Sequence, residues 1–199
     1  MIAIIDYGAG NLASVRKAFA HLNAEVVVTG STEIVNSADK IVLPGVGHFS
    51  SLQALDRDGL RAAAINGIHA GKPFLGICLG MQWLFEGSEE SADLSGAGIF
   101  SGRCRQFPSS VKSPHVGWNS LAVREGSYLL RGVTEDSFVY YTHSFLAPVV
   151  AETAAATEYG VKFSGAVERR NICGVQFHPE KSGDVGLTIL KNFCEMRPC

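Results

Sequence analysis

In one stretch of the chain a cysteine has the surroundings of a nucleophile. Residues 76–82 read GICLGMQ, so that Cys78 has a glycine two residues away on either side. An apolar run at 72–77 predicts a buried strand before it, and residues 81–86 predict the first turns of a helix. Glycines let the backbone reverse sharply between two such elements, which is the layout of a nucleophile elbow. The start of a helix favours the reactive thiolate. Cys78 alone would be interpreted as a buried structural cysteine, but the two glycines and its placement favour a nucleophile.

Residues 174–182 (GVQFHPEKS) supply a candidate base for this thiol. His178 and Glu180 have the same parity, so in an extended segment both side chains leave the same face. Pro179 restricts the residue before it to extended backbone, which favours that geometry. The carboxylate would hold one imidazole nitrogen and turn the other toward a thiol, as in a triad of nucleophile, base and orienter. His178 alone would be interpreted as a surface histidine, but the pair together with Cys78 favours catalysis.

Two glycine-rich loops follow other apolar runs. Residues 44–47 (PGVG) are either a chain reversal or a loop that presents backbone N–H groups to a developing negative charge. The sheet expected for this chain puts the loop beside Cys78, which favours the second interpretation. Residues 8–13 (GAGNLA) match the dinucleotide-binding pattern, but the strand that follows does not end in the acid that would contact a ribose. A tight turn or a partner-contact loop is therefore favoured there.

The remaining histidines and cysteines give weaker signals. His115 and His143 lie among aromatic residues and are either core or interface histidines or substrate contacts. The sequence contains no CxxC and no Cys/His pair at ligand spacing, so we expect neither a disulfide framework nor a metal site, and no cofactor. Four cysteines receive no role: Cys104, Cys173, Cys194 and Cys199.

The elements that must position these residues alternate in type along the chain. Strands are predicted at residues 2–6, 26–28, 41–43 and 72–77, with helical patterns between them. This alternation predicts an α/β fold with an open, mostly parallel sheet flanked by helices, whose function gathers at the carboxyl ends of the strands. Residues 87–102 predict an irregular polar connection. Short β-like runs after it predict extra antiparallel strands in the C-terminal half, before a last helix at 185–196.

Composition limits the classes of function. The 199 residues suit a single domain, 1–199, and 46% hydrophobic with 18% charged residues is typical of a soluble globular protein. A net charge of -2 without blocks of like charge gives no support to a nucleic-acid or membrane partner. The start turns acidic too early for a signal peptide, and no apolar run approaches the roughly 20 residues that span a bilayer. We therefore expect a cytoplasmic protein.

Together these motifs resemble the class I (triad) glutamine amidotransferases. GICLGMQ and FHPE are the most diagnostic pieces of that resemblance. Within the class, DYGAGN, PGVGHF, HVGWN, YYTHSF and GVQFHPEKS are similar to the glutaminase subunits of imidazole glycerol phosphate synthases, and the resemblance covers essentially the whole chain. Met81 stands where other glutaminase domains carry a histidine, and Phe145 stands where a tyrosine is common. The resemblance implies a flavodoxin-like sheet.

The resemblance also implies a reaction. Cys78 would attack the side-chain amide of L-glutamine to form a glutamyl thioester, with His178 handling the proton and Glu180 orienting it. The oxyanion would be held by the N–H of Leu79 and by a backbone N–H of the loop at 44–47, that of Val46 after a peptide flip, with Gly47 as part of the same oxyanion site. The residues that would hold glutamine are Gly47, Gln82, Glu90, Ser144 and Phe145.

A partner is implied as well. Ammonia would pass to a separate cyclase subunit with a (β/α)8 barrel, in a heterodimer that makes imidazole glycerol phosphate and an aminoimidazole carboxamide ribotide in histidine biosynthesis. Asn11, Trp118 and Lys181 would contact this subunit, and a salt bridge of Lys181 would couple docking to catalysis. Two alternatives remain: another cysteine hydrolase on the same sheet, or a regulatory module without catalysis. The FHPE segment disfavours the first and the complete triad disfavours the second.

Overall fold

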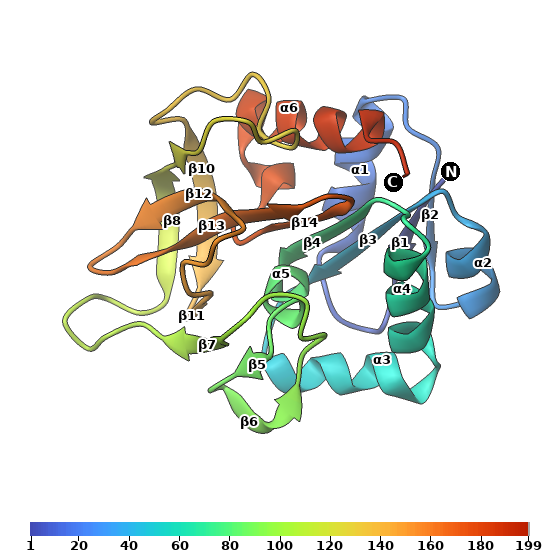
Figure 1. Ribbon diagram of the computed structural model, residues 1–199, viewed down its shortest axis with the longest axis horizontal. Helices are drawn as coiled ribbons and strands as arrows, with labels where there is room; N and C mark the ends of the chain where they lie inside the picture. The colour runs from blue at the N-terminus through green and yellow to red at the C-terminus, as the bar shows by residue number, and fades with distance from the viewer. Residues whose placement is uncertain (199) are drawn as a thin grey trace.

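The computed structural model describes residues 1–198, so Cys199 lies outside the described residues. Its centre is an eight-stranded sheet in the order β2-β1-β3-β4-β14-β13-β12-β9 (Figure 1). Its strands are β1 Ile2–Ile5, β2 Val26–Thr29, β3 Lys40–Gly45, β4 Phe74–Cys78, β9 Ala122–Val123, β12 Thr153–Glu158, β13 Lys162–Arg169 and β14 Ile172–Val175. The strands from β2 to β14 run parallel, and those from β13 to β9 are antiparallel. The predicted fold class, including the antiparallel strands of the C-terminal half, is confirmed.

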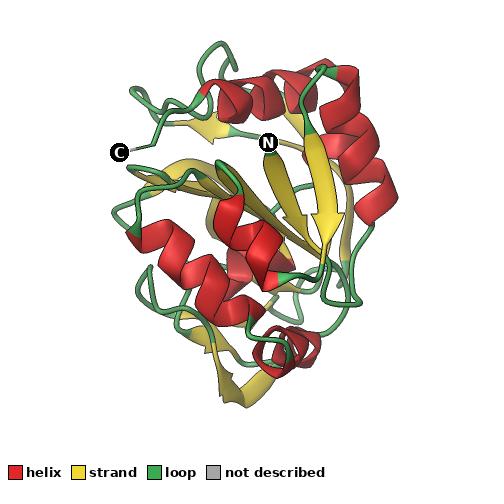
Figure 2. Cartoon of the chain, turned by 90° about the vertical axis from the view of Figure 1, so that its right-hand side faces the viewer, coloured by secondary structure: helices red, strands yellow, loops and turns green. Residues whose placement is uncertain are grey.

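Helices cover both faces of this sheet (Figures 1 and 2). One face carries α1 Leu12–His21 and α6 Gly183–Glu195; the other carries α2 Thr32–Ser37, α3 Ala54–Arg57, α4 Leu60–His69, α5 Leu79–Trp83 and the 3₁₀ turn η1 Phe49–Gln53. The alternation of β1 explains the two layers, because Ile2 and Ile4 pack toward α1 and α6 while Ala3 and Ile5 pack toward the other helices. In residues 1–198 no helix is both long and apolar enough to cross a bilayer.

The other strands form two smaller sheets outside the main one. The antiparallel pair is β8 His115–Ser120 and β10 Phe138–His143, and the four-stranded sheet contains β5 Gly87–Ser88, β6 Ser91–Ser95, β7 Arg103–Gln106 and β11 Phe145–Leu146. The prediction of an irregular connection at 87–102 is wrong at its start, where β5 and β6 form a hairpin. Pairing with β7 and two hydrogen bonds from Arg103, to the carbonyls of Ser88 (3.0 Å) and Ala92 (2.9 Å), stabilise strands too short to show periodicity.

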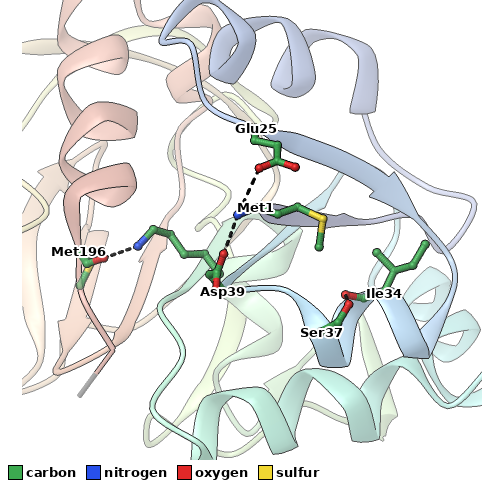
Figure 3. A network of polar contacts seen from close by, with 7 residues as sticks. Met1, Glu25, Ile34, Ser37, Asp39 and Met196 are labelled. Atoms are coloured by element: carbon green, nitrogen blue, oxygen red, sulfur yellow. Dashed lines mark hydrogen bonds and ion pairs between the residues drawn. The ribbon is translucent and has the colours of Figure 1, made fainter.

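The amino ends of the parallel strands are tied together by charged groups (Figure 3). The N-terminal ammonium of Met1 lies 2.6 Å from a carboxylate oxygen of Asp39 and 3.9 Å from one of Glu25. The ammonium of Lys40 donates to the carbonyl of Met196, just after α6. These contacts join β1, β2, β3 and the end of the chain at the edge of the sheet away from the glycine loops.

A buried side-chain amide also joins segments at the amino ends of the parallel strands. Asn171 lies directly before β14, and its Nδ2 donates to the carbonyls of Ile68 (3.0 Å) and Lys72 (2.8 Å). Both hydrogens of the amide are therefore used by backbone acceptors, which fixes the loop between α4 and β4 to the start of β14.

Candidate active site

The sharp turn predicted at Cys78 is present. β4 ends at Cys78 and α5 begins at Leu79, and Cys78 has φ 54° and ψ −105°, a strained conformation for a residue with a side chain. The two glycines are sterically required: a Cβ on Gly80 would collide with the carbonyl of Leu43, and one on Gly76 would collide with the carbonyl of Gly80. The thiol is consequently held at the carboxyl edge of the sheet by the packing around it.

Strand register brings the other two motifs to this turn. β4 lies between β3 and β14, so that Ile77 is level with Pro44 on one side and Val175 on the other. Gly45 is level with Cys78 itself. The PGVG loop therefore leaves the sheet beside the cysteine, as expected, and the segment after β14 leaves it on the opposite side.

His178 and Glu180 form a buried pair, but not by the predicted route. The imidazole Nδ1 lies 2.8 Å from Oε1 of Glu180, and the side chains are only 2% and 1% exposed. His178 is extended, as the following proline requires, whereas Pro179–Lys181 form a 3₁₀ turn (η2) rather than extended chain. Proline has the φ of a first helical residue, so it starts the turn that brings the carboxylate back to the ring.

The electrostatics of the pair favour a charged imidazole. Burial disfavours the imidazolium, but the interactions with Cys78 and Glu180, both hydrogen-bonding and electrostatic, outweigh it and raise the pKa of His178 to about 9. The ring Nε2 is buried without a hydrogen bond of good geometry to any described residue. Cys78 is therefore near enough to act on the charge of the ring while Nε2 is left to meet a substrate.

A cavity of about 330 Å³ opens beside Cys78, a volume in the range of small-molecule sites. It brings together every residue expected to form the oxyanion and glutamine sites: Val46, Gly47, Leu79, Gln82, Glu90, Ser144 and Phe145. Pro114, Thr142 and His143 also line it. Glu90 occupies the turn between β5 and β6, where its Oε2 accepts a hydrogen bond from the N–H of Phe49 at 2.7 Å. This contact fixes the carboxylate at the rim of the cavity.

The loop after β3, where a peptide flip is expected, has open space around Gly47. Gly47 has φ +95°, and no atom lies within 4 Å of where its Cβ would stand. Val46 is 38% exposed. The loop is therefore not clamped by packing, in contrast to Gly80 on the other side of the thiol.

Two histidines left open by the sequence form a buried pair. Nδ1 of His115 lies 3.1 Å from Nε2 of His143, whose Nδ1 lies 2.8 Å from the carbonyl oxygen of Phe145. Burial lowers the pKa of His115 to about 4 and that of His143 to about 3. Both rings are accordingly neutral. His143 is thus both a core residue and part of the cavity wall, because it supports the Phe145 carbonyl.

Gln176, which is not among the predicted site residues, is fully buried directly after β14. Its Nε2 donates to Sγ of Cys78 at 3.6 Å, and its Oε1 accepts from Nε2 of Gln82 at 3.1 Å. The signal was a polar residue between Val175 and Phe177 in an otherwise apolar run, since a polar side chain in a buried strand requires partners.

Two of the three residues expected to meet a partner, Trp118 and Lys181, are exposed and contact the same aromatic ring. Trp118 is 55% exposed, and its ring centroid lies 6.1 Å from that of Tyr140. The ammonium of Lys181 lies 5.7 Å from the centre of the Tyr140 ring, so one aromatic residue joins β8 to η2. Asn11 is partly buried directly before α1.

The first glycine loop has the geometry of a turn. Gly8 and Gly10 have φ 85° and 125°, and Asp6 accepts a hydrogen bond from the N–H of Gly8 at 2.9 Å. Residues 1–198 hold no group of three or more His, Cys, Asp or Glu side chains placed to share a metal ion.

Comparison with known proteins agrees with this geometry. The family model described as Glutamine amidotransferase class-I matches residues 3–196, and the chain belongs to that family. Imidazole glycerol phosphate synthase subunit HisH of Methanothermobacter thermautotrophicus is 48% identical to it over 197 residues, covering 98% of both chains. The protein of the same name from Bacillus cereus (strain B4264) is 45% identical over 195 residues, covering 97% of this chain and 93% of the relative.

Solved structures support the fold. A crystal structure of a glutamine amidotransferase superposes with a TM-score of 0.76 at 16% identity, covering 97% of this chain and 99% of the other. PurLQS from Thermotoga maritima superposes with a TM-score of 0.72 at 19% identity, covering 96% of each chain. At these identities the likeness concerns the fold alone.

Proposed function

We propose that residues 1–199 act as one glutaminase domain, the ammonia-producing subunit of an imidazole glycerol phosphate synthase. It hydrolyses L-glutamine to glutamate and ammonia. The observation that carries the proposal is the buried His178–Glu180 pair across the sheet edge from Cys78, beside a cavity whose lining suits a small amino acid. Identity of 48% to a relative with that name, over 98% of both chains, supports this subunit rather than another amidotransferase.

In the first half-reaction the Cys78 thiolate attacks the side-chain carbonyl carbon of glutamine. The C–N bond then breaks, and the imidazolium of His178 gives its proton to the departing nitrogen, so that ammonia and a glutamyl thioester form. A pKa of about 9 means that His178 carries this proton at neutral pH. Glu180 accepts a hydrogen bond from Nδ1 throughout and keeps Nε2 turned toward the substrate.

In the second half-reaction water attacks the thioester. Neutral His178 takes one proton from the water as its oxygen bonds to carbon, and the C–S bond breaks to return the thiolate. The second proton of the water stays on the new γ-carboxyl group, which loses it to solvent as glutamate is released. Each tetrahedral intermediate carries a negative oxygen that needs donors in place. The N–H of Leu79 and, after a peptide flip at Gly47, that of Val46 would serve.

The groups that hold glutamine are one side chain of opposite charge to its ammonium group and several neutral hydrogen-bonding groups. The carboxylate of Glu90 suits the α-ammonium group. The carboxamide of Gln82 and the backbone of Gly47, Ser144 and Phe145 offer neutral hydrogen bonds to the rest of the molecule. The α-ammonium group and the side-chain amide of glutamine therefore each find a suitable partner.

Ammonia passes to a cyclase subunit with a (β/α)8 barrel, which makes imidazole glycerol phosphate and the aminoimidazole carboxamide ribotide in histidine biosynthesis. An exposed apolar group on the β8–β10 face supports a docking surface there: Val116 (56% exposed), Trp118 (55%) and Phe138 (56%). Such a patch is typical of an interaction site. Asn11 and Lys181 are proposed to flank it.

The test is glutamate release from glutamine, measured first with this chain alone and then with the cyclase subunit and its ribonucleotide substrate. Strong activation only when both are added is the expected result, and Cys78→Ser should abolish it. Labelling of Cys78 by a glutamine-like diazo ketone, but not by a peptide chloromethyl ketone, separates this function from a cysteine peptidase. Absence of glutamate in every condition would contradict the proposal.

A further inference from the structure

Three side chains form a chain of hydrogen bonds that ends on the nucleophile. Nε2 of Gln82 donates to the carbonyl of Phe145 at 3.0 Å and to Oε1 of Gln176 at 3.1 Å. Nε2 of Gln176 donates to Sγ of Cys78 at 3.6 Å. Gln82 is 4% exposed, Gln176 0% and Cys78 6%, so water does not compete for these groups.

The donor and acceptor of each of these three hydrogen bonds follow from one group, the backbone carbonyl of Phe145. A backbone carbonyl only accepts, so the end of Gln82 that faces Phe145 must be the NH₂ group. The same NH₂ group faces Gln176, whose near atom must therefore be the carbonyl oxygen. The far end of Gln176, toward Cys78, is then NH₂, which only donates. The amide orientation at the sulfur is consequently fixed by a carbonyl on β11.

The backbone gives Gln176 little freedom to move away. Its N–H donates to the carbonyl of Gly165 on β13 at 2.8 Å, so the sheet ladder continues past the end of β14. His178 lies two residues later in the same segment. The base and the amide donor thus reach the nucleophile from one rigid strand.

We propose that Gln176 is a further catalytic residue, whose amide N–H hydrogen-bonds the sulfur of Cys78 and stabilises it as the thiolate. A hydrogen bond to the charged form favours that form, and a bond to an ionised acceptor is stronger than one to a neutral thiol. The same donor assists the second half-reaction, in which the thiolate is the leaving group. The kinetic part of this proposal rests on the proposed glutaminase function; the effect on the thiol does not.

A buried amide with a purely structural role looks different in this protein. Asn171, at the other end of β14, gives both of its hydrogens to backbone carbonyls. Gln176 instead points a hydrogen at sulfur, which is a weak acceptor unless it is ionised. Asn171 is accordingly a matched control, because its replacement also removes a buried amide from an end of the same strand.

The experiment is the pH dependence of alkylation of Cys78 by iodoacetamide, quantified by mass spectrometry on the peptide that carries this residue. Gln176→Leu removes the donor, and Gln176→Glu keeps the shape but replaces the donor by a carboxylate oxygen. The midpoint should rise by about one pH unit in Gln176→Leu and further in Gln176→Glu, a loss of about tenfold in rate near neutral pH. Asn171→Leu should keep the midpoint of the original protein.

Kinetics give the second readout. With glutamine, kcat of Gln176→Leu should fall about ten- to a hundredfold, because the donor acts on the nucleophile. KM should change by a smaller factor, through the lost contact with Gln82. An unchanged alkylation midpoint in a folded Gln176→Glu variant would overturn the proposal, even if Gln176→Leu did not fold. A shifted midpoint in a protein that never releases glutamate would support Gln176 and contradict the glutaminase function, so the two failures are distinguishable.

Discussion

The two ends of β14 differ in how they use buried polar groups. At the amino end Asn171 satisfies both amide hydrogens with backbone carbonyls, and the charged groups around Met1 lie near solvent in pairs. At the carboxyl end Cys78 is strained, while Nε2 of His178 and Oε2 of Glu180 are buried without a hydrogen bond of good geometry to any of residues 1–198. A buried polar atom without a hydrogen-bond partner lowers the stability of the folded protein.

The difference separates two tasks within one sheet. At the amino end the buried amide of Asn171 has acceptors for both of its hydrogens, and it therefore contributes stability. At the carboxyl end His178 and Glu180 have polar atoms that can still form hydrogen bonds, and the backbone of Cys78 is strained. These features serve a substrate that is bound only during the reaction. Substitutions at the carboxyl end should consequently reduce activity more than stability, and substitutions at the amino end should reduce stability more than activity.

The largest separation is expected for Cys78→Gly. Loss of the nucleophile should reduce glutamate release by at least about 10⁴-fold. Glycine adopts a positive φ without strain, so the free energy of unfolding should rise by about 1 kcal/mol. Urea denaturation beside the activity assay measures both, with Cys78→Ala as the control that removes the thiol but keeps the strain. A Cys78→Gly protein less stable than Cys78→Ala would contradict the assignment of strain to this position.

Glu180→Gln should have the next largest effect. Loss of the carboxylate lowers the pKa of His178 from about 9, so less imidazolium is present to protonate ammonia, and kcat should fall by about 10²-fold or more. The pH optimum should move to lower pH. A pH profile of kcat measures this, and an optimum that stays in place would argue against the His178–Glu180 interaction as its cause.

The same raised pKa predicts how stability depends on pH. His178 binds its proton more tightly in the folded chain than at the ordinary value of 6.5, so this contribution is complete below about pH 6.5 and is lost as pH rises through about 9. The free energy of unfolding should decline by a few kcal/mol over that interval. The decline should be absent in His178→Gln, and an equal decline in that variant would assign it to other groups.

Asn171→Ala should reverse the pattern seen at the carboxyl end. Two buried carbonyls lose their donor, which should lower the free energy of unfolding by about 1 to 3 kcal/mol. The kcat of the folded variant should stay within about twofold of the original, because the site lies at the other edge of the sheet. A large loss of kcat without loss of stability would show that the two ends are coupled.

Asp39→Asn should have the smallest effect. Its carboxylate pairs with the ammonium of Met1 at 2.6 Å in an exposed position, so solvent and salt weaken the interaction. A slight loss of stability is expected at low ionic strength, and it should disappear in 1 M salt without any change in kcat. A loss that persisted at high salt would mean that packing rather than charge is affected.

Much of the site follows from local sequence because glycine and proline act locally. The spacing of Gly76, Cys78 and Gly80 predicts the strained turn, and the structure explains it by collisions of any added Cβ. The contact between His178 and Glu180 was anticipated for a different reason, since parity in an extended chain does not describe a 3₁₀ turn. A short proline-initiated turn is determined by packing and by capping bonds, which the alternation of residues does not report.

The rest depended on contacts between distant segments. Gln176 acquires its role from Gln82 and Phe145, which are 94 and 31 positions away, and only strand order brings them together. The β5–β6 hairpin is similarly stabilised by Arg103 rather than by periodicity of its own. Side chains whose partners lie across a sheet leave only one trace in the sequence, a polar residue in an apolar run.

The position of β14 has a consequence for the way in which this protein is made. Of the eight strands of the main sheet, β14 is the last to leave the ribosome, yet it lies in the middle of the sheet, between β4 and β13. Cys78 is translated about a hundred residues before the histidine that activates it. A chain whose synthesis has not yet reached His178 therefore exposes a thiol without its base, and it cannot hydrolyse cellular glutamine until that segment has been translated.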